Sequence, residues 1–322
     1  MRETNPMNKL KILGGMVVHE IKLLLRSKWL LNFTLLFLAM AALFYFYGLQ
    51  SVETDPKEVV YGLESMGTEI DTGTVDPSYF GLDVIEVEEN KETAESAGYS
   101  RAIAMLMNLS LWLIPVICLI LGSNSIITDK EGGGLSLYRT YHMPFTYYVL
   151  SKFIALCVSL LASLGVSYGV FGIIVSLTGQ GAQGTYFQTF LWLNVFLVIV
   201  FSALSLFIGS ISTTRMQGLS FALIAWSFLV FVYEFIVFSV VDFVSYGQKL
   251  TGMLLFILMN PIESLRVWSI EKLNAEYIFG PEYLLIHEWG QSGMLTNYLI
   301  VSIIAMIVMA LSVSTVVMKK RG

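Results

Sequence analysis

Six long apolar segments, separated by polar loops of unequal charge, dominate this chain of 322 residues. A helix needs about 20 mostly apolar residues to cross the ~30 Å hydrocarbon core of a membrane, and each segment meets that requirement. Backbone groups inside lipid must bond to one another, which favours helices. The segments are Trp29–Tyr47, Ala104–Ile127, Thr146–Ser176, Phe187–Ile211, Gln217–Val241 and Thr296–Met318. The sequence therefore predicts an all-α membrane protein with six transmembrane helices.

The distribution of basic residues predicts the orientation. If both termini lie on one side of the membrane, that side carries 13 of the 19 lysines and arginines, and the other side carries 6 in much longer loops. Cytoplasmic loops are enriched in Lys and Arg, so we expect both termini in the cytoplasm. We also expect the first apolar segment to remain as an anchor, because a charged stretch precedes it and no small-residue cleavage site follows it.

The polar stretches divide the chain into regions. Before the first span, apolar positions recur at helical spacing opposite a basic face, which is typical of an interfacial helix and equally of a solvated helix leading into the membrane. The stretch Gln50–Arg101 has 13 acidic and three basic residues, and it is either a solubilising loop or a surface for a cationic partner or metal ions. The predicted organisation is an interfacial helix (1–28), a first span (29–49), an acidic external loop (50–103), spans two to five (104–241) with a cytoplasmic coupling loop (128–147), an external segment (242–295), and the last span with a basic tail (296–322).

The external segment contains apolar pieces that are too short to cross a membrane. Leu250–Met259 is one such piece, and Asn260-Pro261 follows it directly. Tyr283–Trp289 is a second, amphipathic piece. Runs of this length indicate short re-entrant or external helices, which we expect to cap the outer end of the bundle.

The motifs of common catalytic sites are missing or misplaced. The sequence has no G-x-x-x-x-G-K-[ST] phosphate loop and no H-E-x-x-H zinc motif. Gly165–Gly169 matches the G-x-S-x-G nucleophile pattern, but it lies inside an apolar segment, where G-x-x-x-G spacing indicates close helix packing. Cys118 and Cys157 lie in apolar segments and are predicted to be free packing residues. We therefore expect no enzyme activity and no cofactor in this chain. We also expect no nucleic-acid partner, because the net charge is −5 and the basic residues are split among several loops without forming a continuous patch.

Two features are candidates for function. Glu234 lies about 10 Å inside the fifth apolar segment, where a carboxylate either bonds to a neighbouring helix or serves a translocation path or conformational latch. The polar loop after the second segment begins Asp129-Lys130-Glu131 and continues to Arg139, and early acids with a later base suit a short helix. Such a helix is either a docking site for a soluble partner or an ordinary interhelical turn. Met306 and Met309 share a helix face, so copper ligation is an alternative to their use as apolar filler.

Several stretches together resemble the six-span permeases of type-2 ABC exporters. Within that family the likeness is greatest to the branch that serves maturation of the copper sites of nitrous oxide reductase. The stretches are Glu20–Leu30, Ala104–Gly122, Asp129–Lys152, Tyr233-Glu234 and Asn260–Val267. The coupling loop departs from the family pattern where Asp129 replaces a glutamate, Gly134 a threonine and Ser151 a glycine.

The resemblance implies one half of a homodimeric permease in a prokaryotic cell membrane. Each copy would be bound by a cytoplasmic ABC ATPase subunit that holds ATP and Mg, with an accessory protein on the outer side. Such a permease couples ATP hydrolysis to translocation or conformational signalling, here in copper-site maturation. The alternatives are an exporter of a drug, peptide or lipid, and a non-transporting anchor or sensor for an extracytoplasmic partner.

The resemblance also implies site residues. ATPase coupling falls to Asp129, Lys130, Glu131, Gly133, Leu135 and Arg139, and contacts of the interfacial helix fall to Glu20, Lys22 and Arg26. The intramembrane path is assigned to Tyr233 and Glu234, and the external gate to Asn260, Pro261, Glu263 and Arg266.

Overall fold

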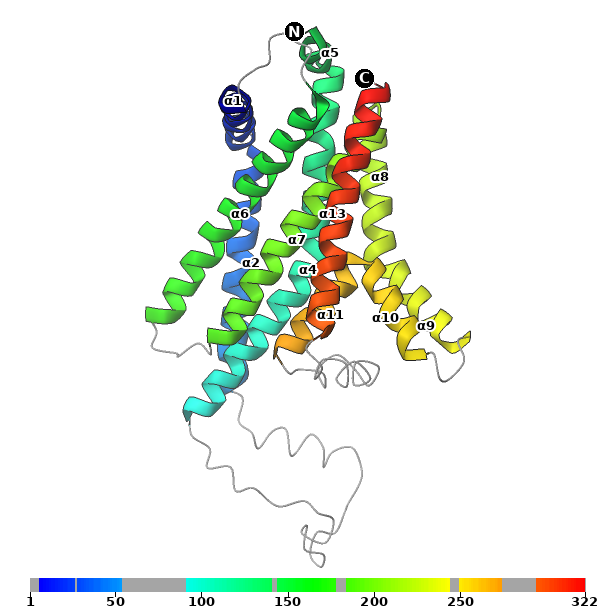
Figure 1. Ribbon diagram of the computed structural model, residues 1–322. Coiled ribbons are helices and arrows are strands. Elements are labelled where there is room, and N and C mark those ends of the chain that lie inside the picture. Colours follow the sequence, from blue (N-terminus) through cyan, green and yellow to red (C-terminus); the bar gives the residue numbers. More distant parts are fainter. Residues whose placement is uncertain are drawn as a thin grey trace, which may run out of the picture.

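The computed structural model describes residues 6–26, 28–53, 91–140, 144–177, 184–243, 249–273 and 294–321. Every regular element within these ranges is a helix, as predicted. Figure 1 shows the helices as one elongated bundle, with α1 (Pro6–Arg26), α5 (Gly134–Thr140) and the C-terminal end of α13 (Met294–Arg321) at the same end. Most of the acidic loop and the amphipathic piece Tyr283–Trp289 lie outside the described residues.

The other helices form the spans and the connections between them. They are α2 (Lys28–Glu53), α4 (Lys91–Glu131), α6 (Phe145–Leu177), α7 (Gly184–Ile211), α8 (Arg215–Ser227), the π-helical η2 (Phe228–Val232), α9 (Tyr233–Phe243), α10 (Lys249–Met259) and α11 (Pro261–Leu273). Two boundaries differ from the prediction, because α2 continues to Glu53 and α4 already begins at Lys91. The region predicted as a loop over 50–103 therefore has helical ends. Hydropathy does not mark them, since a helix outside the hydrocarbon needs no apolar side chains.

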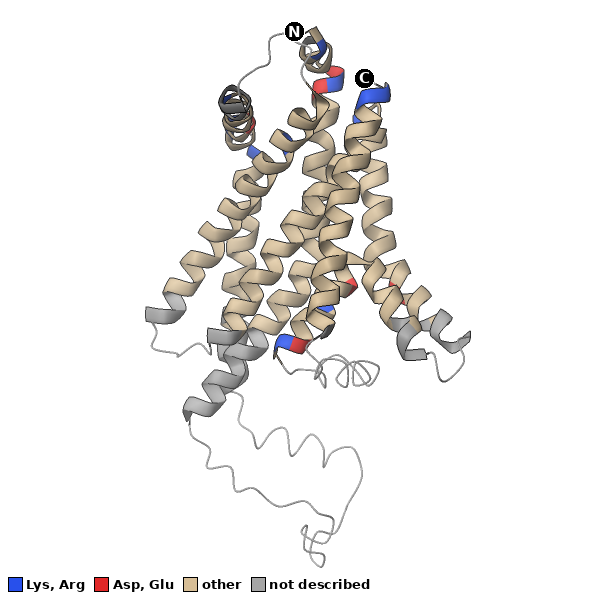
Figure 2. Cartoon of the chain, viewed as in Figure 1, with Lys and Arg blue, Asp and Glu red and all other residues tan. Residues whose placement is uncertain are grey.

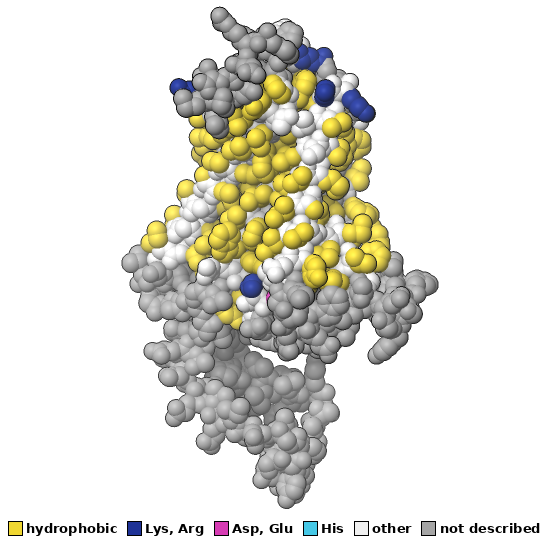
Figure 3. Space-filling view, in the orientation of Figure 1, with side chains coloured by type: hydrophobic (Ala, Val, Ile, Leu, Met, Phe, Trp, Pro, Cys, Tyr) yellow, Lys and Arg dark blue, Asp and Glu magenta, His cyan; other side chains and the backbone are white. Residues whose placement is uncertain are grey.

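The described helices include five stretches that are long and apolar enough to cross a membrane. They are Ile103–Glu131, Phe145–Ile173, Tyr186–Ile211, Arg215–Val237 and Leu295–Lys320. A sixth crossing is obtained when α1 and α2, which are bent by 67° relative to each other, count as one span. Charged residues gather at the two ends of the bundle (Figure 2), and hydrophobic side chains cover the middle of the visible face (Figure 3).

The centre of the bundle is the contact between α4 and α7, which is the most extensive among the described helices. Small residues permit it: a Cβ added at Gly209 would lie 2.8 Å from a backbone oxygen of α4, and one at Gly122 would collide with the Ser205 side chain. The close helix packing predicted at Gly165 and Gly169 is not made by the described residues of this chain. Nothing among the described residues lies within 4 Å of a Cβ built at either position. Cys118 and Cys157 are free and buried, as predicted.

The fifth span is interrupted, and the segment after it returns into the bundle. The π-helical turn η2 separates α8 from α9, and α9 packs against α10 where both diverge from the bundle (Figure 1). α11 then packs against α7 and α13, with Pro261–Ile270 buried throughout. Its start follows from the sequence, since Asn260 accepts a hydrogen bond from the backbone N–H of Ile262 at 3.0 Å and Pro261 occupies the first helical position. α10 corresponds to the predicted short piece Leu250–Met259, whereas α11 is an additional short helix.

Candidate functional site

An ion-pair cluster joins α1, α4 and α6 at the end of the bundle that carries α5. The Nζ of Lys152 lies 3.0 Å from both carboxylate oxygens of Glu20 and 2.9 Å from Oδ2 of Asp129, and it donates to Oγ of Ser125 at 3.0 Å. The hydroxyl of Tyr148 donates to the same Asp129 oxygen at 2.8 Å. The Lys152 side chain is only 2% exposed. We call these five residues the Lys152 cluster.

Helical spacing brings the members of the Lys152 cluster together. Ser125 and Asp129 are four residues apart on α4, and Tyr148 and Lys152 are four residues apart on α6, so each pair shares a helix face. Burying a charge is costly unless it is paired and hydrogen-bonded. Because the buried ammonium finds both its carboxylates on other helices, the cluster favours one position of α1 against α6 and α4.

Lys130, the residue after Asp129, binds the C-terminal end of α7. The Nζ of Lys130 donates to the backbone oxygens of Gly209, Ser210 and Ser212 at 2.8, 2.7 and 2.7 Å. These carbonyls lie at the C-terminal end of α7, where the last oxygens of a helix lack intrahelical partners and carry partial negative charge. Lys130 therefore supplies hydrogen bonds to the terminal carbonyl groups of α7 and connects this end of α7 to α4.

Glu131 binds the N-terminal end of α8, so here a negative side chain meets the positive end of a helix. Its Oε1 accepts the backbone N–H of Arg215 at 3.1 Å, and its Oε2 accepts Nε of the same residue at 2.7 Å. Arg215 is the first residue of α8, and a carboxylate is favourable at the positive end of a helix. This ion pair is exposed, with the Arg215 side chain 59% accessible, so it contributes little to stability.

Asp129, Lys130 and Glu131 end α4 and do not begin the short helix predicted from the sequence. Each contacts a different span, and these contacts offset the unfavourable placement of two acids at a helix C-terminus. The chain leaves α4 through Gly133, whose φ of +76° favours glycine. The short helix does exist, but it is α5, beginning at Gly134.

α5 carries two of the predicted coupling residues, Leu135 and Arg139. Leu135 and Tyr138 pack toward the bundle, and the Tyr138 hydroxyl donates to the Pro144 carbonyl at 3.0 Å. Burial raises the pKa of Tyr138, so its phenol stays neutral and keeps this bond. Gly133 and Arg139 are exposed. One face of α5 therefore packs against the bundle, and the opposite face is exposed to solvent.

On α1 the three predicted residues have different environments. Glu20 faces α6 and pairs with Lys152, whereas Lys22 and Arg26 are exposed. Lys152 and Arg215 were not predicted as site residues from the sequence. The available signal was a basic residue inside the apolar segment that begins at Thr146, because a charge there requires a buried partner.

A second cluster lies at the opposite end of the bundle. Nη1 of Arg266 lies 3.0 Å from Oε1 of Glu263, one turn earlier on α11, and 3.1 Å from Oε1 of Glu234 on α9. The side chains of Arg266 and Glu263 are 7% and 5% exposed, and that of Glu234 is 38% exposed. Of the alternatives for Glu234, the structure shows a bond to a neighbouring helix. With Tyr233 and Asn260, these residues form what we call the Arg266 cluster.

Two neutral hydrogen bonds complete the Arg266 cluster. The Tyr233 hydroxyl donates to the Phe256 carbonyl on α10 at 2.7 Å, and Nδ2 of Asn260 donates to the Leu229 carbonyl in η2 at 2.8 Å. The pair of Glu234 and Arg266 therefore joins one predicted path residue directly to one predicted gate residue. Asn260, between α10 and α11, bonds to the π-helical turn of the fifth span, and Tyr233 bonds to α10 directly after that turn. Such π-helical turns are often found at functional sites.

Comparisons with known proteins agree on one family. A sequence model of the family described as "ABC-2 family transporter protein" matches residues 16–322. The chain is 25% identical over 178 residues to the "Probable ABC transporter permease protein NosY" of Pseudomonas aeruginosa, which is 54% of this chain and 64% of that protein. It is 25% identical over 174 residues to the protein of the same description from Stutzerimonas stutzeri, which is 52% of this chain and 62% of that protein. The matched segments span less than two thirds of either relative.

Proposed function

The chain belongs to the ABC-2 transporter family, and we propose that it is the permease subunit of a type-2 ABC exporter powered by a separate ATPase subunit. The sequence lacks a G-x-x-x-x-G-K-[ST] phosphate loop, so ATP and Mg would be held by that partner. The assembly would contain two copies of this chain and two ATPase subunits. The charge bias supports an orientation with α1, α5 and the C-terminal end of α13 in the cytoplasm, and the family resemblance implies a prokaryotic cell membrane.

One observation carries the proposal: the end of α4 is bonded to three other helices through charged groups and is linked to a fourth through Lys152. Asp129 pairs with Lys152 of α6, which also pairs with Glu20 of α1, while Lys130 binds α7 and Glu131 binds α8. The exposed face of α5, with Arg139, directly follows this end. A force applied by an ATPase to α5 or α1 would therefore act on several spans together, which suits a bundle with two packing arrangements.

The Arg266 cluster would then gate the outer end of the path. It links the half-exposed Glu234 to a buried arginine on the re-entrant α11. Rearrangement of the spans would change the distance between α9 and α11 and so strain or release this pair. We assign the process served to copper-site maturation of nitrous oxide reductase, in keeping with the resemblance to that branch and the similarity to two NosY permeases.

Co-purification tests the coupling surface. The tagged chain is isolated in mild detergent from its host membranes, bound subunits are identified by mass spectrometry, and ATP hydrolysis is measured. We expect an ABC ATPase in equal amount, reduced about tenfold in Arg139→Glu, as for a central arginine of an interface. The matched control is Lys272→Glu, which reverses an exposed charge at the opposite end and should retain the ATPase.

Two results would contradict the proposal. Absence of any ATPase from an intact dimer would remove the transporter function and favour a membrane anchor or sensor. Equal loss in both variants would remove the assignment of α5. Separately, deletion of the gene should lower the copper content of the host's nitrous oxide reductase, and unchanged copper content would show that the exporter serves another cargo.

A further inference from the structure

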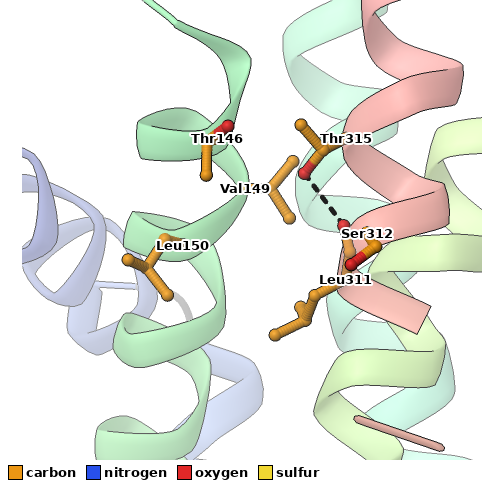
Figure 4. A pocket seen from close by; sticks show the side chains of 6 residues that line it. All are labelled: Thr146, Val149, Leu150, Leu311, Ser312 and Thr315. Carbon is orange, nitrogen blue, oxygen red and sulfur yellow. Dashed lines mark hydrogen bonds between the residues drawn. The ribbon is translucent and has the colours of Figure 1, made fainter. Parts of the chain in front are cut away.

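A pocket lies between α6 and α13 near the end of the bundle that carries α1 and α5. Its volume is about 390 Å³, and it is lined by Thr146, Val149, Leu150, Leu311, Ser312 and Thr315. Figure 4 shows these side chains on the two helices, with Val149 extending from α6 toward α13. Thr146 and Ser312 are exposed at its rim, and Val149 is buried. The volume falls in the range of about 300–1,000 Å³ typical of small-molecule sites.

The polarity of the pocket changes with depth. α6 begins at Phe145 and α13 ends at Arg321, both at this end of the bundle, so Thr146 and Thr315 are nearest the end. Leu150 and Leu311 lie one helical turn deeper, about 5–6 Å. Figure 4 shows the two threonines at one level and the two leucines below them. The pocket is therefore polar at the level nearest the membrane surface and apolar further in.

A basic residue continues the α13 wall of the pocket outward. Ser312, Thr315 and Lys319 are spaced i, i+3 and i+7, which places them on one helix face. Lys319 is exposed and lies about 6 Å beyond Thr315 along the helix axis. Lys320 is also exposed, but it is turned by about 100° from Lys319 and so points away from the pocket. From the membrane surface inward, this face therefore presents the ammonium group of Lys319, the hydroxyl group of Thr315 and the apolar side chain of Leu311.

We propose that this pocket binds one anionic phospholipid. Its phosphate would bind Lys319, its glycerol ester region would lie between the threonines, and the start of an acyl chain would contact Leu150 and Leu311. Charge complementarity favours this occupant, since basic groups between membrane helices on the cytoplasmic side attract anionic headgroups. Binding requires no ATPase and so goes beyond the proposed function. Only the assignment to the cytoplasmic leaflet depends on the orientation proposed above.

Native mass spectrometry of the purified full chain, with added phosphatidylglycerol or phosphatidylcholine, tests the site. We expect tighter binding of phosphatidylglycerol, weakened about fivefold by Lys319→Gln and less by Lys320→Gln, as for one lysine near a membrane surface. Thr315→Phe should abolish binding by filling the pocket. Val313→Phe adds the same bulk to a nearby exposed position of α13 that does not line the pocket, so it should leave binding unchanged.

Several outcomes would overturn the proposal. They are equal affinity for the two lipids, unchanged binding in Thr315→Phe, equal effects of the two lysine variants, or competition by inorganic phosphate alone, which would indicate a simple anion site. Size-exclusion chromatography checks that the phenylalanine variants are folded. If Thr315→Phe is not, the lysine pair decides, because glutamine adds no bulk to the pocket.

Discussion

Replacing Lys152 with methionine should release α1 from the bundle. The substitution removes the only basic member of the Lys152 cluster and leaves the carboxylates of Glu20 and Asp129 facing each other across the space it occupied. Removing one partner of a buried ion pair costs about 3–5 kcal/mol. Glu20 and Asp129 are 15% and 28% exposed, so water solvates them in part and the lower end of that range, about 3 kcal/mol, applies.

Hydrogen exchange of the protein in lipid nanodiscs measures this effect. A loss of about 3 kcal/mol corresponds to an increase of about 100-fold in the exchange of α1 amides relative to the unchanged protein. Arg215→Met is the matched control, because it breaks an exposed pair with Glu131 that is worth at most about 1 kcal/mol.

Removing the two carboxylates should restore the protection of α1. Neutralising both carboxylates in the triple variant Lys152→Met, Glu20→Gln, Asp129→Asn should recover much of the protection, since no unpaired charge remains. Equal exchange of α1 in Lys152→Met and Arg215→Met would show that the buried pair does not hold α1. Lower protection in the triple variant than in Lys152→Met alone would show that unpaired carboxylates are not the cause.

Two further predictions concern the other end and the centre of the bundle. Arg266→Met leaves the carboxylates of Glu234 and Glu263 without their arginine and should cost about 3–5 kcal/mol in thermal unfolding, whereas an unchanged melting temperature would show that the cluster does not hold α9 to α11. Gly209→Ala places a Cβ 2.8 Å from a backbone oxygen of α4 and should destabilise by about 1–3 kcal/mol. Gly165→Ala meets nothing within 4 Å and should be neutral or slightly stabilising, so equal melting of the two alanine variants would contradict the packing argument.

Properties carried by single segments were predictable. Hydropathy alone indicated the membrane class and the helices, because the cost of unpaired backbone in lipid leaves few other conformations. The start of α11 also depends on neighbouring residues alone, since Asn260 and Pro261 suit the first positions of a helix. Outside the hydrocarbon, water can bond to the backbone, so hydropathy does not predict helices there. The extension of α4 back to Lys91 was therefore not predicted.

The partners of the charged residues were not predictable. Glu234 was correctly singled out as a carboxylate inside a span, but its partner Arg266 lies 32 residues later on a helix that returns into the bundle. Lys152 and Glu20 are 132 residues apart, and neither sequence neighbourhood indicates the other. Asp129 and Glu131 were read as the start of a helix by the dipole rule, whereas contacts with α6 and α8 stabilise them at the end of one.

The sequence by itself determined that this chain is a helical membrane protein, where its spans lie, and which of its ends is more basic. These properties follow from the hydropathy and charge of neighbouring residues, so they can be predicted without knowing the fold. Only the tertiary structure decided which glycines allow close packing, which carboxylate each buried cation binds, and that α6 and α13 leave a pocket between them. Those outcomes depend on distances between segments remote in sequence, and they are set by the packing of the whole bundle.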